Sequence, residues 1–230
     1  MALKDDLETK SRSIFSSRWT KRDGYVIPTD NSVGLGNEGV EIEATVLYAD
    51  LSNSTILVDG YSADFAAEVY KSYLHNAAKI IRSENGEITA YDGDRIMAVF
   101  IGDSKNSAAV RAAMKINWAV LNIINPALAN TYGVDKYNVK QVVGIDTSKL
   151  LVAKTGIRGA NDLVWVGRAA NYAAKLSAEK SYPTFITEAV YNRLSTETKF
   201  SNNVNMWNQL RWTTMNNMTI YGSTYWWSFS

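Results

Sequence analysis

Residues 41–55 read EIEATVLYADLSNST, and residues 86–102 read GEITAYDGDRIMAVFIG. The first stretch alternates polar and apolar residues and then becomes apolar, which predicts a buried strand over residues 41–49. The second contains two β-rich runs around Asp92-Gly93, a dipeptide that predicts a β-hairpin. Between the two stretches, Ser62 is a suitable N-cap for an amphipathic helix over residues 63–83. In a strand–helix–hairpin unit of this kind, the first strand and the hairpin are usually neighbours.

The rest of the chain continues the same alternation of long helices and hairpins. We expect a helix over 3–15, a helix over 108–128, two strands around Asp146-Thr147-Ser148 within 140–152, a strand over 163–166, a helix over 168–180, a strand and short helix over 185–191, and a hairpin after 205. Together these predict an α+β sandwich, with helices flanking a mostly antiparallel sheet. We expect a short N-terminal arm over 1–40, a catalytic domain over 41–196 and a C-terminal β-hairpin over 197–230 that completes it.

The composition excludes several classes of function. A net charge of +1, from 24 basic and 23 acidic residues, argues against a nucleic-acid or membrane-surface partner. Cysteine is absent, so thiolate chemistry is excluded. With His75 as the single histidine, a Ser-His-Asp triad or a two-histidine zinc site has almost nothing to be built from. A metal would therefore be a hard cation held by oxygen ligands. The N-terminus has no apolar signal region and no run is long enough to span a membrane, so we expect a cytoplasmic protein.

Two aspartates stand at positions suited to metal binding. Asp50 ends the first buried strand, and Asp94 lies in the turn of the hairpin. Two carboxylates at such a point can hold one or two magnesium or manganese ions for phosphoryl transfer. The following segment could cradle phosphates with its backbone N–H groups and hydroxyls; it consists of Leu51, Ser52, Asn53, Ser54 and Thr55. From spacing alone, a loop-capping Asp50 and an ordinary turn residue at Asp94 remain an open alternative.

Four blocks in this order resemble the class III nucleotidyl cyclases: YADLSNST (48–55), YDGDRIMAVF (91–100), VVGIDTS (142–148) and VGRAANYAAKL (166–176). The resemblance covers roughly residues 41–195. It implies two divalent cations, Mn²⁺ or Mg²⁺, and a head-to-tail homodimer with active sites at its interface. One chain would supply the two aspartates, and the other would supply polar residues of the last block.

The resemblance also implies roles for individual residues. Asp50 and Asp94 match the metal-binding aspartates, and Leu51 matches the position whose carbonyl joins the metal shell. Asn171 matches the asparagine that positions the ribose. Lys175 stands where the family has a transition-state arginine, a departure because lysine lacks the planar fork that grips phosphate oxygens. Either Lys175 suffices, or Arg168 assists it, or the domain is a non-catalytic nucleotide-binding or scaffolding one.

The positions that read the base in purine cyclases are occupied here by Ala90 and Val164. Neither side chain can form a hydrogen bond with a purine edge. The bulky neighbours Tyr91 and Trp165 could narrow the pocket, although strand alternation points them the other way unless the register slips by one residue. If either of them points out of the pocket, this would favour a purine cyclase that selects its base through other residues.

The altered pocket and the lead-in IPTDNSVGLGNEGVEIEATVLYADLS (27–52) resemble the pyrimidine cyclases of bacterial antiphage signalling, the Pycsar type. This resemblance implies cyclic UMP made from UTP, or cyclic CMP made from CTP, and a separate effector protein that reads the product. Candidate base readers are Arg95 and Arg158, which are also ordinary surface arginines in the alternative interpretation. Because arginine offers donors only and uracil offers two carbonyl acceptors, they favour UTP.

Overall fold

The structure, a computed structural model, describes residues 2–229. The helices are α1 (Leu3–Ser16), α2 (Ser54–Gly60), α3 (Ala63–Ser83), α4 (Lys105–Ala119), α5 (Asn125–Tyr132), α6 (Arg168–Leu176), α7 (Glu188–Tyr191) and α8 (Thr196–Lys199). The strands are β1 (Thr20–Asp23), β2 (Glu38–Leu51), β3 (Glu87–Asp92), β4 (Arg95–Phe100), β5 (Gln141–Ile157), β6 (Ala160–Val166), β7 (Thr184–Thr187), β8 (Phe200–Ser201), β9 (Val204–Asn205), β10 (Asn208–Trp212) and β11 (Met218–Ser223).

Within residues 2–229, nine strands form one sheet in the order β10-β11-β7-β5-β2-β4-β3, with β1 beside β2 and β6 beside β5. The β1–β2 and β5–β7 pairs are parallel. The pairs β2–β4, β3–β4, β5–β6, β7–β11 and β10–β11 are antiparallel. The predicted α+β class, the mostly antiparallel sheet and the C-terminal hairpin (β10–β11) are therefore confirmed.

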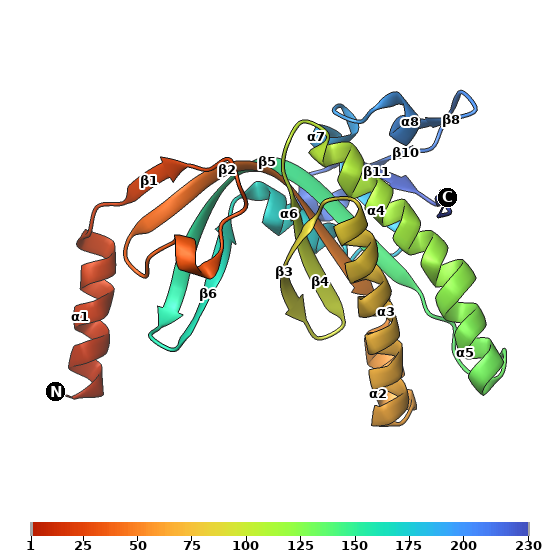
Figure 1. Cartoon of the computed structure of the whole chain (residues 1–230), viewed down its shortest axis with the longest axis horizontal. Coiled ribbons are helices and arrows are strands. Elements are labelled where there is room, and N and C mark those ends of the chain that lie inside the picture. The colour runs from red at the N-terminus through yellow and green to blue at the C-terminus, as the bar shows by residue number, and fades with distance from the viewer. Residues whose placement is uncertain (1, 230) are drawn as a thin grey trace. The chain divides into compact units, whose positions relative to one another are not determined.

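The chain forms two compact units, and the long strands β2 and β5 contribute residues to both. The first unit contains residues 2–43 and 149–167, which include α1, β1 and the β5–β6 hairpin. The second contains residues 44–148 and 168–229, which include most of the sheet and the remaining α-helices (Figure 1). The boundaries expected near residues 40 and 196 stay predictions.

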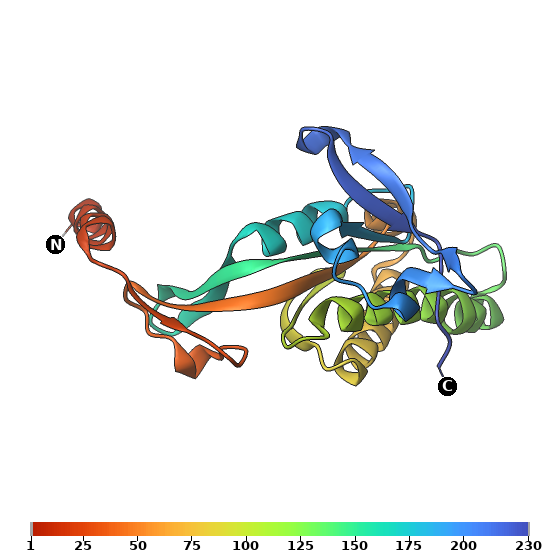
Figure 2. The ribbon, with the colours of Figure 1, turned by 90° about the horizontal axis from the view of Figure 1, so that it is seen from above.

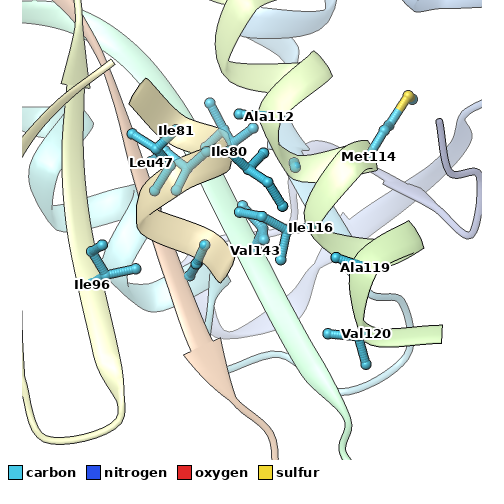
Figure 3. Packing of buried hydrophobic residues seen from close by; sticks show 14 of the residues in the cluster. Leu47, Ile80, Ile81, Ile96, Ala112, Met114, Ile116, Ala119, Val120 and Val143 are labelled. Atoms are coloured by element: carbon cyan, nitrogen blue, oxygen red, sulfur yellow. The ribbon is translucent and has the colours of Figure 1, made fainter. Parts of the chain in front are cut away.

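One face of the sheet in the second unit is covered by α3 and α4. Ser62 caps α3 as predicted, with its hydroxyl accepting from the Phe65 amide at 3.4 Å. Figure 3 shows how side chains of both helices pack against the strands in the largest buried cluster. Leu47 of β2 and Ile96 of β4 are both fully buried and lie on the α3–α4 side of the sheet. The helix expected over 108–128 is α4 followed by a π-helical turn, Val120–Ile124, and α5.

The opposite face carries α6, which Figure 2 shows on the other side of the strands from α3 and α4. The fit of α6 on β5 depends on Gly144, because a Cβ there would collide with backbone atoms of Ala173 and Ser177. Val142 and Leu176 are buried together on the α6 side of the sheet, whereas Val143 belongs to the buried cluster on the α3–α4 side. The alternation along β5 therefore separates the two layers.

The prediction of two strands around Asp146-Thr147-Ser148 is wrong, because residues 141–157 form the single strand β5. These three residues resemble a turn in sequence. In the structure the Asp146 carboxylate is fully buried, and it accepts hydrogen bonds from Arg168 and from the Thr187 hydroxyl. Tertiary partners thus satisfy polar groups that would otherwise favour a turn.

No helix within residues 2–229 is both long and apolar enough to cross a bilayer.

Candidate active site

Asp50 lies near the end of β2, in a row of charged residues that crosses three strands. Arg95 of β4 is directly opposite Asp50, and Asp92 of β3 is directly opposite Arg95. Arg95 donates from Nη2 to Asp92 Oδ2 at 2.6 Å. Residues directly opposite each other share one face of a sheet, so all three side chains lie on the face away from α3 and α4.

The next row of residues on this face, one position further into the sheet, consists of uncharged side chains. Tyr48, Met97 and Ala90 are opposite one another on β2, β4 and β3. The Arg95 guanidinium lies 5.3 Å from the centroid of the Tyr48 ring, within cation–π range. Met97 is only 4% exposed and Tyr48 is half-buried. The face is thus polar at the strand ends and apolar one row inward.

Asp94 occupies the two-residue turn between β3 and β4. Gly93, at φ +61°, takes the first central position, where a positive φ excludes most other residues. Within residues 2–229, the Asp94 Oδ2 atom is buried and has no hydrogen-bond partner. A buried carboxylate oxygen is costly to leave unpaired, so this atom points to a ligand that supplies a donor or a positive charge.

The negative charge of Asp94 lies close enough to Asp50 to influence the ionisation of the Asp50 carboxyl. Burial raises the pKa of Asp50 to about 6, the negative charge of Asp94 adds to the rise, and the Arg95 guanidinium opposes it. The same two carboxylates contribute to the raised pKa of Tyr70, after burial. A cation bound between the carboxylates would remove their repulsion and would favour the ionised form of Asp50.

The residues present fit a hard divalent cation of the magnesium or manganese type. Asp50 and Asp94 supply carboxylate oxygens, and the Leu51 carbonyl at the end of β2 is the predicted backbone ligand. Across residues 2–229, no group of three or more His, Asp or Glu side chains could hold a metal by itself. Magnesium characteristically takes one or two protein carboxylates and completes its shell with water and substrate phosphate oxygens.

The predicted phosphate-binding segment follows Asp50 directly. Leu51 ends β2 and is 5% exposed, and the Ser52 amide donates to the Lys140 carbonyl at 2.8 Å. Asn53 has a left-handed conformation, with φ +61°, and Ser54 begins α2. Thr55 is exposed in the first turn of α2. The segment is therefore a tight turn into a short helix.

Asn171 and Lys175 lie four residues apart on α6 and are both exposed. The Lys175 ammonium is 3.3 Å from Met215 Sδ. Within the described residues, no hydrogen bond or ion pair connects either side chain to Asp50 or Asp94. The structure thus brings together the two predicted metal ligands and, separately, the two predicted helix residues.

The start of α6 is anchored to β5. Arg168 donates from Nε to Asp146 Oδ2 at 3.0 Å and from Nη2 to the Thr147 carbonyl at 2.7 Å. The Ser148 hydroxyl accepts from the Ala169 amide at 3.0 Å. Arg168 is therefore engaged in holding the helix.

The predicted base-reading residues fall at different places. Ala90 and Arg95 lie on the face of Asp50. Tyr91 is opposite Ile96 and therefore lies on the α3–α4 side, even though β3 has a bulge between Ile88 and Ala90. Tyr91 therefore does not fill the space beside Ala90, which on its own would favour a larger base.

Val164 and Arg158 belong to the first compact unit. Val164 pairs with Ala153, and Trp165 pairs with Val152, in the β5–β6 hairpin. Arg158 lies in the exposed turn of this hairpin. Val164 and Trp165 therefore point to opposite faces of β6.

Sequence reasoning missed Tyr48 and Asp146. Tyr48 is two residues before Asp50, and strand periodicity alone could have placed it on the same face. Asp146 carries a raised pKa, caused first by burial. Its role in holding α6 could not be recognised, because its partners Arg168 and Thr187 are remote in sequence.

Comparison with solved structures identifies the fold. The adenylyl cyclase CyaB from P. aeruginosa has a TM-score of 0.69 and 19% identity, covering 81% of this chain and 95% of that one. The fold is that of the class III nucleotidyl cyclases.

Comparison with known sequences gives the family. The chain is 54% identical over 228 residues to a uridylate cyclase of Xanthomonas perforans, covering 99% of each chain. It is 49% identical over 230 residues to a uridylate cyclase of Burkholderia cepacia, covering 99% of this chain and all of that one. The chain therefore belongs to the uridylate cyclase family and is an enzyme of the nucleotidyl cyclase class. No protein-family model matches it.

Proposed function

We propose that the chain converts UTP to 3′,5′-cyclic UMP and pyrophosphate. The observation that supports this most strongly is the buried, unpartnered Asp94 oxygen beside the raised-pKa carboxyl of Asp50. Such an arrangement suits divalent cations that carry a nucleoside triphosphate. The names of the full-length relatives support uracil as the base.

In the proposed reaction, the ribose 3′-oxygen forms a bond to the α-phosphorus. The bond from that phosphorus to the bridging oxygen of the leaving group breaks, pyrophosphate departs, and the 3′-hydroxyl proton passes to water. Two bound divalent cations would lower the pKa of the 3′-hydroxyl and neutralise the triphosphate. No protein base is required for this step.

The chain's own residues supply binding and orientation. Asp50, Asp94 and the Leu51 carbonyl would hold the cations, and the triphosphate would lie along residues 51–55. Asn171 orients the ribose, and Lys175 meets negative charge that develops at phosphorus. Because Asn171 and Lys175 are not joined to the aspartates within one chain, we propose a head-to-tail homodimer in which each site uses both copies.

Base selection is proposed to depend on the row beside the charges. Ala90 offers no polar contact, while Tyr48 and Met97 occupy the face next to it. Arg95 supplies hydrogen-bond donors for the carbonyl oxygens of uracil. CTP is the nearest alternative substrate, because cytosine has one such carbonyl.

A purine cyclase is a second candidate. The position of Tyr91 on the α3–α4 side, away from Ala90, favours it. The contact between Arg95 and the Tyr48 ring disfavours a purine, because the two side chains occupy part of the face beside Ala90. The non-catalytic alternative is set aside, because the chain belongs to a family of enzymes.

The cellular role follows from the resemblance to antiphage cyclases and is also a proposal. The cyclic nucleotide would act in the cytoplasm as a second messenger of antiviral defence, read by a separate effector protein.

The test is incubation of the purified protein with ATP, GTP, CTP and UTP separately in Mn²⁺, followed by mass spectrometry. We expect cyclic UMP from the parent protein and none from Asp50→Ala. Asp59→Ala, which changes an exposed aspartate in α2, is the matched control. Cyclic AMP or cyclic GMP as the main product would overturn the assignment of the base pocket.

A further inference from the structure

The N-terminal helix α1 has an apolar stripe that nothing within residues 2–229 covers. None of its residues is buried within the described chain. Leu3, Leu7 and Ile14 are 73%, 57% and 45% exposed. At 3.6 residues per turn these three side chains fall within about 40° of one another around the helix axis. A 14-residue helix is only marginally stable in water by itself, so a partner that covers the stripe would stabilise α1.

The helix is nevertheless fixed to the chain at its C-terminal end. The Asn37 side chain donates to the carbonyls of Ile14 and Ser17, at 2.8 and 2.9 Å. Ser17 also closes the last turn through its amide and hydroxyl, which both bond to the Ser13 carbonyl. The stripe is thus presented by an anchored helix.

The charges of α1 are divided along its length. Three acidic residues and one lysine lie in residues 3–8, whereas residues 9–16 contain only basic charges, Lys10 and Arg12. Two copies placed antiparallel would therefore set each acidic half against a basic half. Parallel copies would set like charges side by side, which is unfavourable.

Asp6 and Lys10 make this complementarity specific. Both flank the same side of the stripe, one turn apart. Within residues 2–229 neither forms an ion pair, whereas Glu8 is paired with both Lys4 and Arg12. In an antiparallel pair, Leu3 of each helix faces Ile14 of the other, and Asp6 of each lies beside Lys10 of the other.

We propose that α1 is a self-association element, which pairs antiparallel with α1 of a second copy of this chain. The contact uses the stripe Leu3, Leu7 and Ile14 and two symmetric Asp6–Lys10 ion pairs. It uses none of the residues of the candidate active site and does not rest on the proposed function. The equal numbers of acidic and basic residues on α1 favour this partner over an anionic membrane, which attracts helices with an excess of basic charge.

The absence of cysteine permits a direct test by site-specific cross-linking. Lys4 and Ser11 flank the other side of the stripe, and antiparallel pairing brings Lys4 of one copy beside Ser11 of the other. We expect a short bismaleimide to link Lys4→Cys to an affinity-tagged Ser11→Cys in a mixture. Either variant alone should give little product.

Variants of exposed residues test the stripe and the charges. Leu7→Asp should abolish the cross-link, whereas Thr9→Asp, on the polar side, should leave it unchanged. Asp6→Lys should lose most of the product, and adding Lys10→Asp should restore it. These changes are made in the cysteine variants, and circular dichroism should show the same fold for each.

Several results would overturn the proposal. One is the absence of a mixed cross-link, and another is equal product from either cysteine variant alone, which parallel pairing would give. A third is a cross-link that survives Leu7→Asp. A fourth is that the protein fails to cross-link but floats with phosphatidylserine–phosphatidylcholine vesicles, and that Leu7→Asp abolishes this flotation. That result would assign the stripe to a membrane.

Discussion

Arg95 stands directly opposite Asp50 across the β2–β4 ladder, and its guanidinium lies 5.3 Å from the centre of the Tyr48 ring. One side chain therefore touches both the charged row and the apolar row of the candidate site. Its positive charge opposes the rise in the Asp50 pKa, and its Nε atom is buried without a partner in the described chain. In the proposed function, Arg95 would therefore link metal binding at Asp50 to recognition of the base.

Arg95→Ala should lower kcat/KM for UTP by about tenfold or more, since a lost hydrogen bond from a charged donor costs roughly 1.5–3 kcal/mol. The loss should be smaller for CTP, whose base has one fewer carbonyl acceptor. Arg82→Ala, an exposed change near the end of α3, is the control. Equal losses for both nucleotides would show that Arg95 acts only through Asp50.

Asp50→Asn should stabilise the protein at pH 8 in EDTA. The folded-state pKa of Asp50, about 6, lies above its ordinary value of 3.8, so the parent loses stability as pH rises through this window. After allowance for partial exposure, we expect a gain of ~1–2 kcal/mol at pH 8 and a smaller one below pH about 4.

The measurement is urea unfolding of both proteins across this pH range, with Asp59→Asn as control. Mn²⁺ should raise the Tm of the parent but not that of Asp50→Asn. A stability difference that does not vary with pH would contradict the assignment of the raised pKa to Asp50.

Arg168→Ala should destabilise the fold by about 2–4 kcal/mol, because it leaves the buried Asp146 carboxylate without its cationic partner. Arg168 itself is partly exposed, which limits the loss. Urea unfolding would measure the effect, and Arg168→Ala/Asp146→Asn should recover part of it. Full stability in the single variant would show that α6 is held by other contacts.

Lys175→Ala should reduce kcat by about 10²-fold, the usual effect of removing one group that stabilises transition-state charge. Because Lys175 is exposed, the free energy of unfolding should change by less than about 0.5 kcal/mol. Lys175→Arg should retain or raise kcat. Lys180→Ala, an exposed lysine beyond α6, is the matched control, and unchanged kcat in Lys175→Ala would remove Lys175 from the site.

Local patterns predicted the elements that carry the candidate site. Asp50 could be placed at the end of a strand and Asp94 in a hairpin turn, because alternation and Asp-Gly chemistry act over a few residues. The continuous strand β5 could not be predicted, because Asp146 is stabilised by Arg168 and Thr187, which are remote in sequence. Strand alternation also predicted that Tyr91 points away from Ala90, and the register with β4 agrees, whereas the bulge between Ile88 and Ala90 has no local signal in the sequence.

Complementation between two inactive variants tests the shared site most directly. Asp50→Asn and Asn171→Ala should each be inactive alone, because each disables both sites of a homodimer. Mixed after dissociation and reassociation, they should regain about a quarter of parental cyclic UMP synthesis, since half of the dimers are mixed and each has one intact site. A mixture that stays inactive, although both variants are folded and dimeric, would contradict a site built from two copies.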